Sequence, residues 1–221
     1  MGGRVFFSPH EKMAKVICFI DGFNLYHALD YFESGPDHHK FRKYKWLNLK
    51  KLASMFVFGK DTLEEILYFT TIATWDAGKT ARHKLYIRAL ESEGVQTIYG
   101  EFKRKKKHCQ LCKGDFWSVE EKQTDVNIAL FLLVRAIQER YEKAIIISGD
   151  TDLLPAVKIV RNTFLGKQIG LVIPIGRASE DFKKQVDFHY KMREHHLAKS
   201  LFPDPLALPD GTSLAKPASW V

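Results

Sequence analysis

The chain has few cysteines and no long hydrophobic run, and each scarcity excludes a class of protein. Three of its 221 residues are cysteine, and Cys18 stands inside an apolar stretch, so a scaffold held by disulfide bonds is not expected. The longest apolar stretches, such as residues 128–134, fall far short of the roughly 20 residues that span a membrane. Residues 1–10 lack the basic and then apolar pattern of a secretory signal. We therefore expect a cytoplasmic protein without a membrane partner.

Apolar and basic residues are abundant. Hydrophobic residues make up 45% of the chain, enough to build the core of one α/β domain, which we predict over residues 14–200. Prolines and a glycine then interrupt residues 201–221, which predicts an extended proline-rich C-terminal tail. The 34 lysines and arginines outnumber the 26 acids, and the net charge of +8 favours an anionic partner such as nucleic acid.

Apolar, β-rich segments alternate along the chain with segments of helical periodicity. Val16–Ile20 is a continuous apolar run, typical of a strand that is covered on both faces. We predict strands at residues 16–20, 66–74, 95–102, 144–147, 167–173 and 186–189, and helices at 49–56, 80–93, 124–140, 152–162 and 191–201. This order predicts an α/β fold whose sheet is mainly parallel.

Four aspartates occupy related places in this pattern. Asp21 directly follows the first predicted strand, and Asp150 and Asp152 follow the strand at 144–147 in the same way. Asp125 lies at the start of the helix at 124–140, where the helix dipole favours its charge. Because the carboxyl ends of parallel strands open on one side of a sheet, we expect these carboxylates to meet at one edge. Taken singly, each is also a common turn former or helix cap.

Carboxylates gathered at one edge repel one another, and a divalent cation relieves that repulsion. Mg²⁺ and Mn²⁺ prefer oxygen ligands, and Mg²⁺ usually keeps several waters. Such an ion polarises a phosphodiester and activates a water molecule. The four acids therefore indicate metal-dependent hydrolysis of phosphodiesters.

Three segments around these acids resemble the motifs of one family. Phe19–Tyr26 is similar to the opening motif of the NYN family, a branch of the PIN-like nuclease superfamily. Glu120–Asn127 and Ser148–Pro155 resemble its central acidic motif and its third motif, and the similarity in spacing extends over about residues 16–175. The resemblance implies a PIN-like three-layer α/β/α sandwich and metal-dependent cleavage of RNA.

The resemblance also implies roles for single residues. Asp21, Asp125, Asp150 and Asp152 are expected to bind Mg²⁺ or Mn²⁺ directly or through water. Asn24 matches a polar active-site residue that orients Asp21 or a phosphate, although a helix cap is an equal alternative. Some relatives carry a Cys-x-x-Cys insertion at the place of residues 103–118 in this chain.

Two runs combine basic with aromatic residues. The first basic run, Lys40–Lys51, includes Phe41, Tyr44 and Trp46, and the second, Lys103–Lys107, follows Phe102. Lysines bind phosphates of any sequence and aromatic rings stack on unpaired bases, so each run could bind single-stranded RNA. Each could equally be a surface loop whose aromatic residues anchor it to the core.

Cys109 and Cys112 form one Cys-x-x-Cys pair beside His108. This is half of a structural zinc site, because tetrahedral zinc takes four protein ligands. A missing ligand could come from elsewhere in the chain or from another subunit, which leaves a homodimer open. Reduced thiols without metal are an equally good interpretation.

These observations favour a metal-dependent endoribonuclease that acts on single-stranded RNA. The alternative is a catalytically weak RNA-binding or regulatory module of the same fold. A phosphatase that uses Asp150 and Asp152 is disfavoured, because such enzymes usually place this pair after an early strand.

Overall fold

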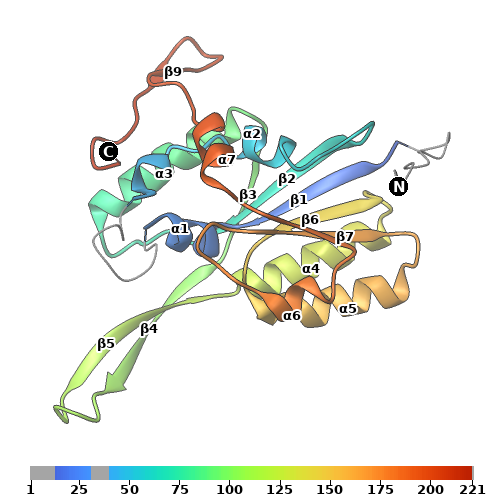
Figure 1. The fold of residues 1–221 in the computed structure, drawn as a ribbon. Helices are drawn as coiled ribbons and strands as arrows, with labels where there is room; N and C mark the ends of the chain where they lie inside the picture. The colour runs from blue at the N-terminus through green and yellow to red at the C-terminus, as the bar shows by residue number, and fades with distance from the viewer. Residues whose placement is uncertain (1–12, 31–39, 221) are drawn as a thin grey trace, which may run out of the picture.

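A computed structural model describes residues 13–30 and 40–220, which form a parallel sheet between two layers of helices (Figure 1). The six strands of the sheet are all parallel and lie in the order β3-β2-β1-β6-β7-β8. They are β1 (Lys15–Asp21), β2 (Thr62–Thr70), β3 (Gln96–Tyr99), β6 (Lys143–Ile147), β7 (Gln168–Ile173) and β8 (Phe188–Lys191). The predicted α/β/α sandwich with a mainly parallel sheet is confirmed.

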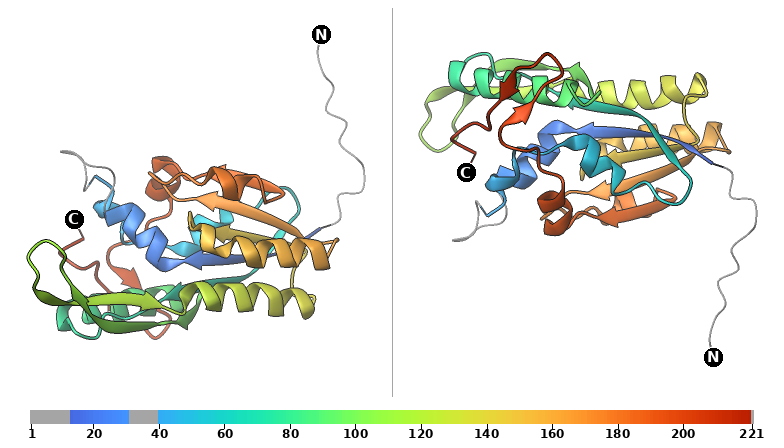
Figure 2. Two further views of the ribbon diagram at one scale, coloured as in Figure 1. Left: turned by 90° about the horizontal axis from the view of Figure 1, so that it is seen from below. Right: turned by 90° about the horizontal axis from the view of Figure 1, so that it is seen from above.

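Two groups of helices cover the two faces of the sheet (Figures 1 and 2). The first face carries α1 (Gly22–Asp30), α2 (Leu49–Ser54), α3 (Ala77–Glu91), α7 (Glu194–Lys199) and the 3₁₀ turn η1 (Arg42–Tyr44). The second face carries the 3₁₀ turn η2 (Thr151–Leu153), α4 (Thr124–Ile137), α5 (Leu154–Thr163) and α6 (Glu180–Lys183). None of the described helices is both long and apolar enough to pass through a membrane.

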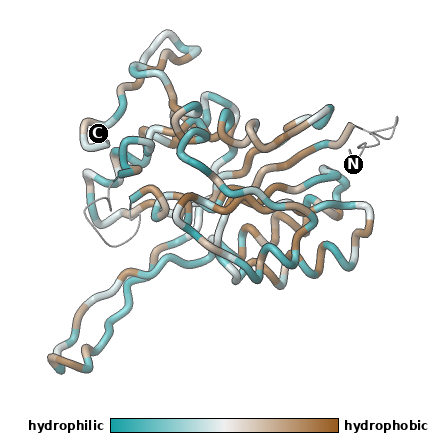
Figure 3. The backbone as a smooth tube through the Cα atoms, viewed as in Figure 1, coloured by the Kyte–Doolittle hydropathy of each residue, from teal (hydrophilic) through white to brown (hydrophobic). Residues whose placement is uncertain are grey.

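The central strands are hydrophobic on both sides, as the sequence predicted. In β1, Cys18 and Ile20 belong to the core on the first face, whereas Ile17 and Phe19 belong to the core on the second. All four side chains are fully buried. Figure 3 shows the strands of the sheet as largely hydrophobic, whereas the long hairpin outside it is mostly hydrophilic.

The segment predicted as one strand at 95–102 is divided at Gly100. Its first part is β3 in the sheet, and its second part begins β4 (Glu101–His108), which pairs with β5 (Asp115–Lys122) as an antiparallel hairpin. A Cβ atom at Gly100 would lie 2.7 Å from Thr71 Oγ1 and 2.8 Å from both Lys122 O and Thr124 Oγ1. The chain turns out of the sheet here because only glycine allows such a close approach. The β4–β5 hairpin projects well beyond the sandwich (Figures 1 and 2).

The tail after residue 200 lies on the domain. It contains a small hairpin of β9 (Leu206–Ala207) and β10 (Ser213–Leu214), where the sequence suggested an extended chain. Leu208 and Trp220 join the core on the first face. The predicted limits of domain and tail stay a prediction, but the two parts share one core.

Candidate active site

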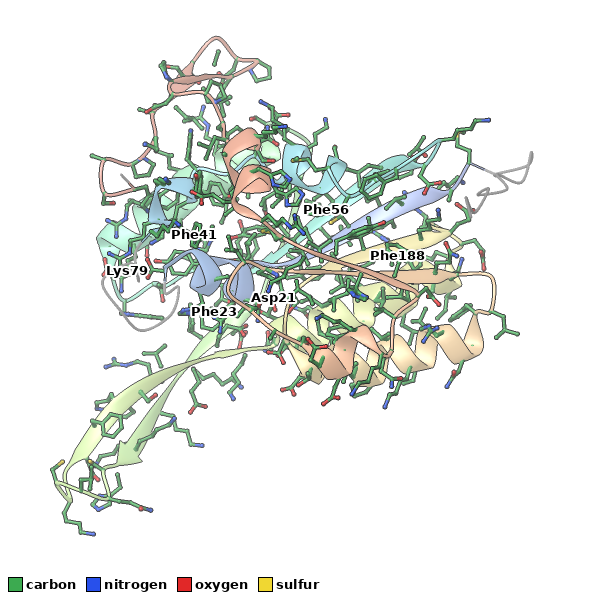
Figure 4. The ribbon with its side chains drawn as sticks, in the orientation of Figure 1. Asp21, Phe23, Phe41, Phe56, Lys79 and Phe188 are labelled. Carbon is green, nitrogen blue, oxygen red and sulfur yellow. The ribbon has the colours of Figure 1, made fainter. Side chains whose placement is uncertain are left out.

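The predicted acids lie at the carboxyl ends of the two central strands. β1 ends at Asp21, and its register pairs Ile20 with Ile147 at the end of β6. The chain leaves β1 toward the first face and β6 toward the second, and the strand order reverses between them. Parallel sheets bind ligands at such a switch point, because the diverging loops open a crevice there. Asp21 lies where β1 passes into α1, near the centre of Figure 4.

Asp21 is held by two hydrogen bonds. Its Oδ1 accepts from the backbone N–H of Asn24 at 2.9 Å, and its Oδ2 accepts from the hydroxyl of Ser148 at 2.8 Å. Burial raises the pKa of this carboxyl to about 6, although the two hydrogen bonds lower it. The charges of Asp150 and Glu121 raise the same pKa further.

The loop after β6 is tied to the same point. Ser148 Oγ accepts from the N–H of Asp150 at 3.0 Å, and Asn24 Oδ1 accepts from the N–H of Gly149 at 3.0 Å. Asp150 Oδ1 accepts from the N–H of Asp152 at 3.0 Å, so Asp150 is also the cap of η2. The side chain of Asn24 bonds across to this loop and not to its own helix. The alternative of a helix cap is therefore wrong for Asn24.

Asp125 lies in the first turn of α4 and faces the same edge. Burial raises the pKa of Asp125 to about 6, and the charges of Asp21, Asp150, Glu121 and Asp152 raise it further. The four predicted aspartates are thus within electrostatic reach of one another at one edge of the sheet. Their role as metal ligands stays a prediction.

Glu121 is an acid of this edge that the sequence analysis did not assign to the site. Its Oε1 accepts hydrogen bonds from the backbone N–H of Thr124 at 3.2 Å, from the hydroxyl of the same residue, and from the hydroxyl of Thr71 at 3.2 Å. These bonds join the end of β2 to the start of α4. The sequence contains Glu121 within the acidic motif but does not distinguish it from Glu120, which forms an ion pair with Lys122 at 3.3 Å.

Arg177 is a cation at this edge that no sequence motif marked. It lies in the loop after β7, and a Cβ atom on Gly149 would sit 3.3 Å from Arg177 Cβ. Burial lowers the pKa of His27 on α1, and the positive charge of Arg177 lowers it further. Within residues 13–30 and 40–220, no ion pair occupies the guanidinium of Arg177. An anion bound at the crevice would meet this group.

The acids at this edge suit a divalent cation that takes few protein ligands and keeps most of its bound water. In the described part of the chain, no three His, Cys, Asp or Glu side chains are arranged as a ready set of ligands. Mg²⁺ does not require such a set, because it is commonly bound by one or two carboxylates, with water and substrate phosphate completing its shell. Burial is the main cause of the raised pKa of Asp21 and Asp125, and the charges of neighbouring acids add to it, so a cation at this edge would relieve their repulsion.

The second basic run lies on β4 and is exposed. The register of the hairpin places Phe102 opposite Glu121, Arg104 opposite Val119 and Lys106 opposite Trp117. Paired residues share a face, so these six side chains define one face of the hairpin, here called the Trp117 face. Residues between them lie on the opposite face, here called the Phe116 face. Its members are Lys103, Lys105, Lys107, Phe116, Ser118 and Glu120.

The Trp117 face begins at the edge of the sheet that carries Asp21, Asp125, Asp150 and Asp152, here called the acidic edge. Glu121 at its base belongs to that edge, and the ring of Phe102 makes an edge contact with Trp75 at 4.7 Å between centroids. Further out, the guanidinium of Arg104 lies 5.4 Å from the centre of the Trp117 ring. Trp75 and Trp117 are 47% and 61% exposed, so these rings are open to a ligand.

The aromatic side chains of the first basic run, in contrast, are buried. The side chains of Phe41, Tyr44 and Trp46 are 3%, 7% and 1% exposed and belong to the core on the first face. The prediction that they stack on bases is therefore wrong, because no base can reach them. The alternative, in which aromatic residues anchor this segment, is confirmed.

Cys109 and Cys112 lie in the loop at the tip of the hairpin. Hydrogen bonds from the backbone N–H and the thiol of Cys112, and from the backbone N–H of Leu111, lower the pKa of the Cys109 thiol. Cys18 is fully buried in β1, and burial raises the pKa of its thiol. The three cysteines are therefore a hydrogen-bonded pair at the tip, of which Cys112 is exposed and Cys109 partly exposed, and one buried core residue.

A parallel three-layer sandwich with acids at its switch point defines a nuclease-like α/β domain. Residues 15–193 match the family model of the NYN domain. The chain belongs to the NYN family, within the PIN-like nuclease superfamily, and its fold is that of proteins that generally act on RNA.

Two further proteins are similar over most of the chain. One is 6-hydroxy-3-succinoylpyridine 3-monooxygenase from Pseudomonas putida, with 25% identity over 245 aligned positions that cover 91% of this chain and 74% of that one. The other is a protein of unknown function from Vibrio parahaemolyticus, whose crystal structure gives a TM-score of 0.53 at 15% identity. That match covers 88% of this chain and all of the other, and it shows the fold alone.

Proposed function

We propose that this protein is a metal-dependent endoribonuclease, with Asp21, Asp125, Asp150 and Asp152 holding Mg²⁺ or Mn²⁺ directly or through water. The observation that carries the proposal is the gathering of these acids at the switch point, where burial raises the pKa of both Asp21 and Asp125 to about 6 and the charges of neighbouring acids raise both further. When bound, the ion supplies Lewis acidity toward a phosphodiester and lowers the pKa of water.

The chain's own residues prepare this edge. Ser148 and the backbone of Asn24 fix Asp21 as an oriented acceptor, and the side chain of Asn24 fixes the loop that carries Asp150. Arg177 meets the negative charge of the scissile phosphate from the side of the crevice that the acids leave free. Asp21 and Asp125, whose pKa values are about 6, become mostly ionised above that pH and are then able to bind a cation.

The Trp117 face of the hairpin supports single-stranded RNA as the substrate. Trp75, Phe102 and Trp117 present rings on which unpaired bases stack, and stacking contributes about 1–3 kcal/mol per base. Lys103 and Lys105 on the other face attract the phosphate backbone. The face extends for roughly 20 Å from Phe102 to the tip at the usual rise of a strand, enough for several nucleotides. A duplex would offer no free bases to these rings.

The decisive variant is Asp150→Asn, because asparagine keeps the oxygen that caps η2 and removes the charge. We expect cleavage of a fluorescent single-stranded RNA in Mn²⁺ to fall by more than about 100-fold, since even residues that only support a metal ligand cost 10–100-fold. Asp210→Asn is the matched control, because Asp210 lies in the tail and pairs with Arg88 at 3.1 Å. Full activity of Asp150→Asn would contradict the proposal.

Two outcomes favour other functions. Tight RNA binding without cleavage in any of several divalent ions would indicate the catalytically weak RNA-binding module. Hydroxylation of 6-hydroxy-3-succinoylpyridine by the purified protein would indicate the chemistry of the Pseudomonas putida relative. Both assays use the full chain of the cleavage test, and the hydroxylation assay also contains O₂ and an electron donor, which a monooxygenase consumes.

A further inference from the structure

The tip of the β4–β5 hairpin presents two thiols that the proposed cleavage does not use. The loop is closed by two backbone hydrogen bonds, from Cys109 N–H to Gly114 O at 2.9 Å and from Lys113 N–H to Cys109 O at 2.9 Å. The N–H groups of Leu111 and Cys112 donate to the sulfur of Cys109, and so does the thiol of Cys112. The two sulfurs therefore lie within hydrogen-bonding distance of each other at the tip.

This turn has the properties of half a tetrahedral zinc site. Zinc binds thiolates, and backbone N–H donors stabilise the thiolate that a metal requires. A structural zinc ion needs four such ligands. His108, whose Nδ1 is hydrogen bonded to Asp115 at 2.9 Å, does not form a metal-binding group with the two thiols in the described part of the chain. Nor does any other His, Cys, Asp or Glu of residues 13–30 and 40–220 complete a metal-binding group with the two thiols.

We propose that two copies of this chain meet at their hairpin tips, and that Cys109 and Cys112 of both copies hold one Zn²⁺ by four thiolates. The tip suits such a contact because it lies at the end of a long arm, clear of the sandwich (Figure 1). A second copy reaches it without colliding with the domain. Each thiol that binds zinc releases its proton to solvent, and no oxidation occurs.

The apolar and charged residues around the thiols suit contact with a second copy of the chain. Leu111 is 96% exposed and Phe116 is 49% exposed, and contact between two tips removes both from water. Zinc with four thiolates carries a net charge of −2, which Lys113 on each copy offsets. The other tip lysines do not make the copies repel, since Lys106 and Lys107 are paired with acids at 2.7 and 2.6 Å.

The test measures zinc content and mass together on the full chain. Reduced protein is reconstituted with ZnCl₂, and we expect one zinc ion per two chains by elemental analysis and a dimer by light scattering. EDTA should remove the zinc and return the monomer. Cobalt in place of zinc should give the intense visible absorption of a tetrahedral thiolate site.

Cys109→Ser and Cys112→Ser should each abolish both the zinc and the dimer. Cys112 is exposed and Cys109 is partly exposed, and unchanged melting temperatures will show that the variants fold. Cys18→Ala is the matched control, because it also removes one thiol but lies fully buried in β1, away from the tip.

Several results would overturn the proposal. One zinc ion in a monomer would mean that a single chain supplies every ligand. A reduced protein that takes up no zinc would mean that the thiols have another purpose. A zinc-dependent dimer that survives in both serine variants would place the ion elsewhere.

Discussion

The two basic runs contain the same kinds of residues but occupy different environments. Trp46 of the first run packs against Phe202 and Trp220, with ring centroids 5.3 and 6.3 Å apart, and is 1% exposed. Trp117, in the hairpin that carries the second run, is 61% exposed and contacts the cation Arg104. The first run crosses a face of the sheet that helices and the tail cover. The hairpin has only two strands, and no layer of residues 13–30 or 40–220 covers it, so Trp117 and Phe116 stay exposed to water.

The charges differ in the same way. Lys45 of the first run forms an ion pair with the buried Asp30, and Lys43 lies 3.6 Å from Glu194. In the second run, Lys103 and Lys105 have no ion-pair partner among the described residues. Cations that are already neutralised contribute little to binding RNA. We therefore predict that Lys43 and Lys45 stabilise the fold, and that Lys103 and Lys105 contact phosphate if the proposed function holds.

Trp46→Ala tests the structural half of this comparison and should have the largest effect. Loss of a buried tryptophan leaves a cavity, and we expect the free energy of unfolding to fall by about 3–5 kcal/mol. Urea denaturation measures this change. Trp117→Ala is the matched tryptophan, and its free energy of unfolding should stay within about 0.5 kcal/mol of the native value. Equal destabilisation by the two variants would refute the comparison.

Trp117→Ala tests the recognition half. Losing one stacked base costs about 1–3 kcal/mol, so we expect the Kd for single-stranded RNA to rise about 5- to 150-fold. Fluorescence anisotropy in EDTA, where nothing is cleaved, gives this Kd. Phe116→Ala removes a comparably exposed ring from the opposite face and should change the Kd much less. If the two variants weaken binding equally, RNA does not follow the Trp117 face.

The edge of the sheet that carries the four aspartates is a third region, and its raised pKa values imply a cost to stability at neutral pH. Because the pKa of Asp21 is raised to about 6, the folded protein keeps a proton between pH 4 and 6 that the unfolded chain has released. Stability therefore falls as the pH rises through this window. Asparagine has no proton to lose, so Asp21→Asn abolishes this loss of stability with rising pH. The variant should therefore stabilise the metal-free protein by up to about 3 kcal/mol at pH 7.5.

The same variant should gain far less at pH 4, where Asp21 is neutral in the folded protein. Denaturation in EDTA at both pH values measures the difference, and RNA cleavage in Mn²⁺ should be lost. An equal gain at pH 4 and pH 7.5 would show that charge is not the cause.

The smallest expected effect concerns the salt dependence of RNA binding. Each phosphate contact that is lost from single-stranded RNA reduces the slope of log K against log salt by about 0.7. The double variant Lys103→Gln and Lys105→Gln should reduce the slope, whereas Lys40→Gln and Lys43→Gln should leave it unchanged. A reduced slope in the second pair would mean that the first run also binds phosphate.

Much of the fold was predictable because hydrophobic periodicity is a local property. The two-sided burial of β1 and the long helix α4 follow directly from their residues. The end of β3 did not, because the turn at Gly100 depends on Thr71 and Thr124, which are distant in the sequence. The four aspartates were found because each stands at the end of a strand or the start of a helix. Glu121 and Arg177 were missed because their places depend on the hairpin register and on a loop from another strand.

The sequence by itself determined that a parallel sheet forms, which acids stand at its carboxyl edge, and that two thiols lie close together along the chain. These are consequences of spacing along the chain, which the sequence states directly. Only the tertiary structure decided which aromatic run is buried and which is exposed. Burial depends on whether another layer covers a segment, and that layer comes from distant parts of the chain: for Trp46 it is the tail, and for Trp117 there is none among the described residues.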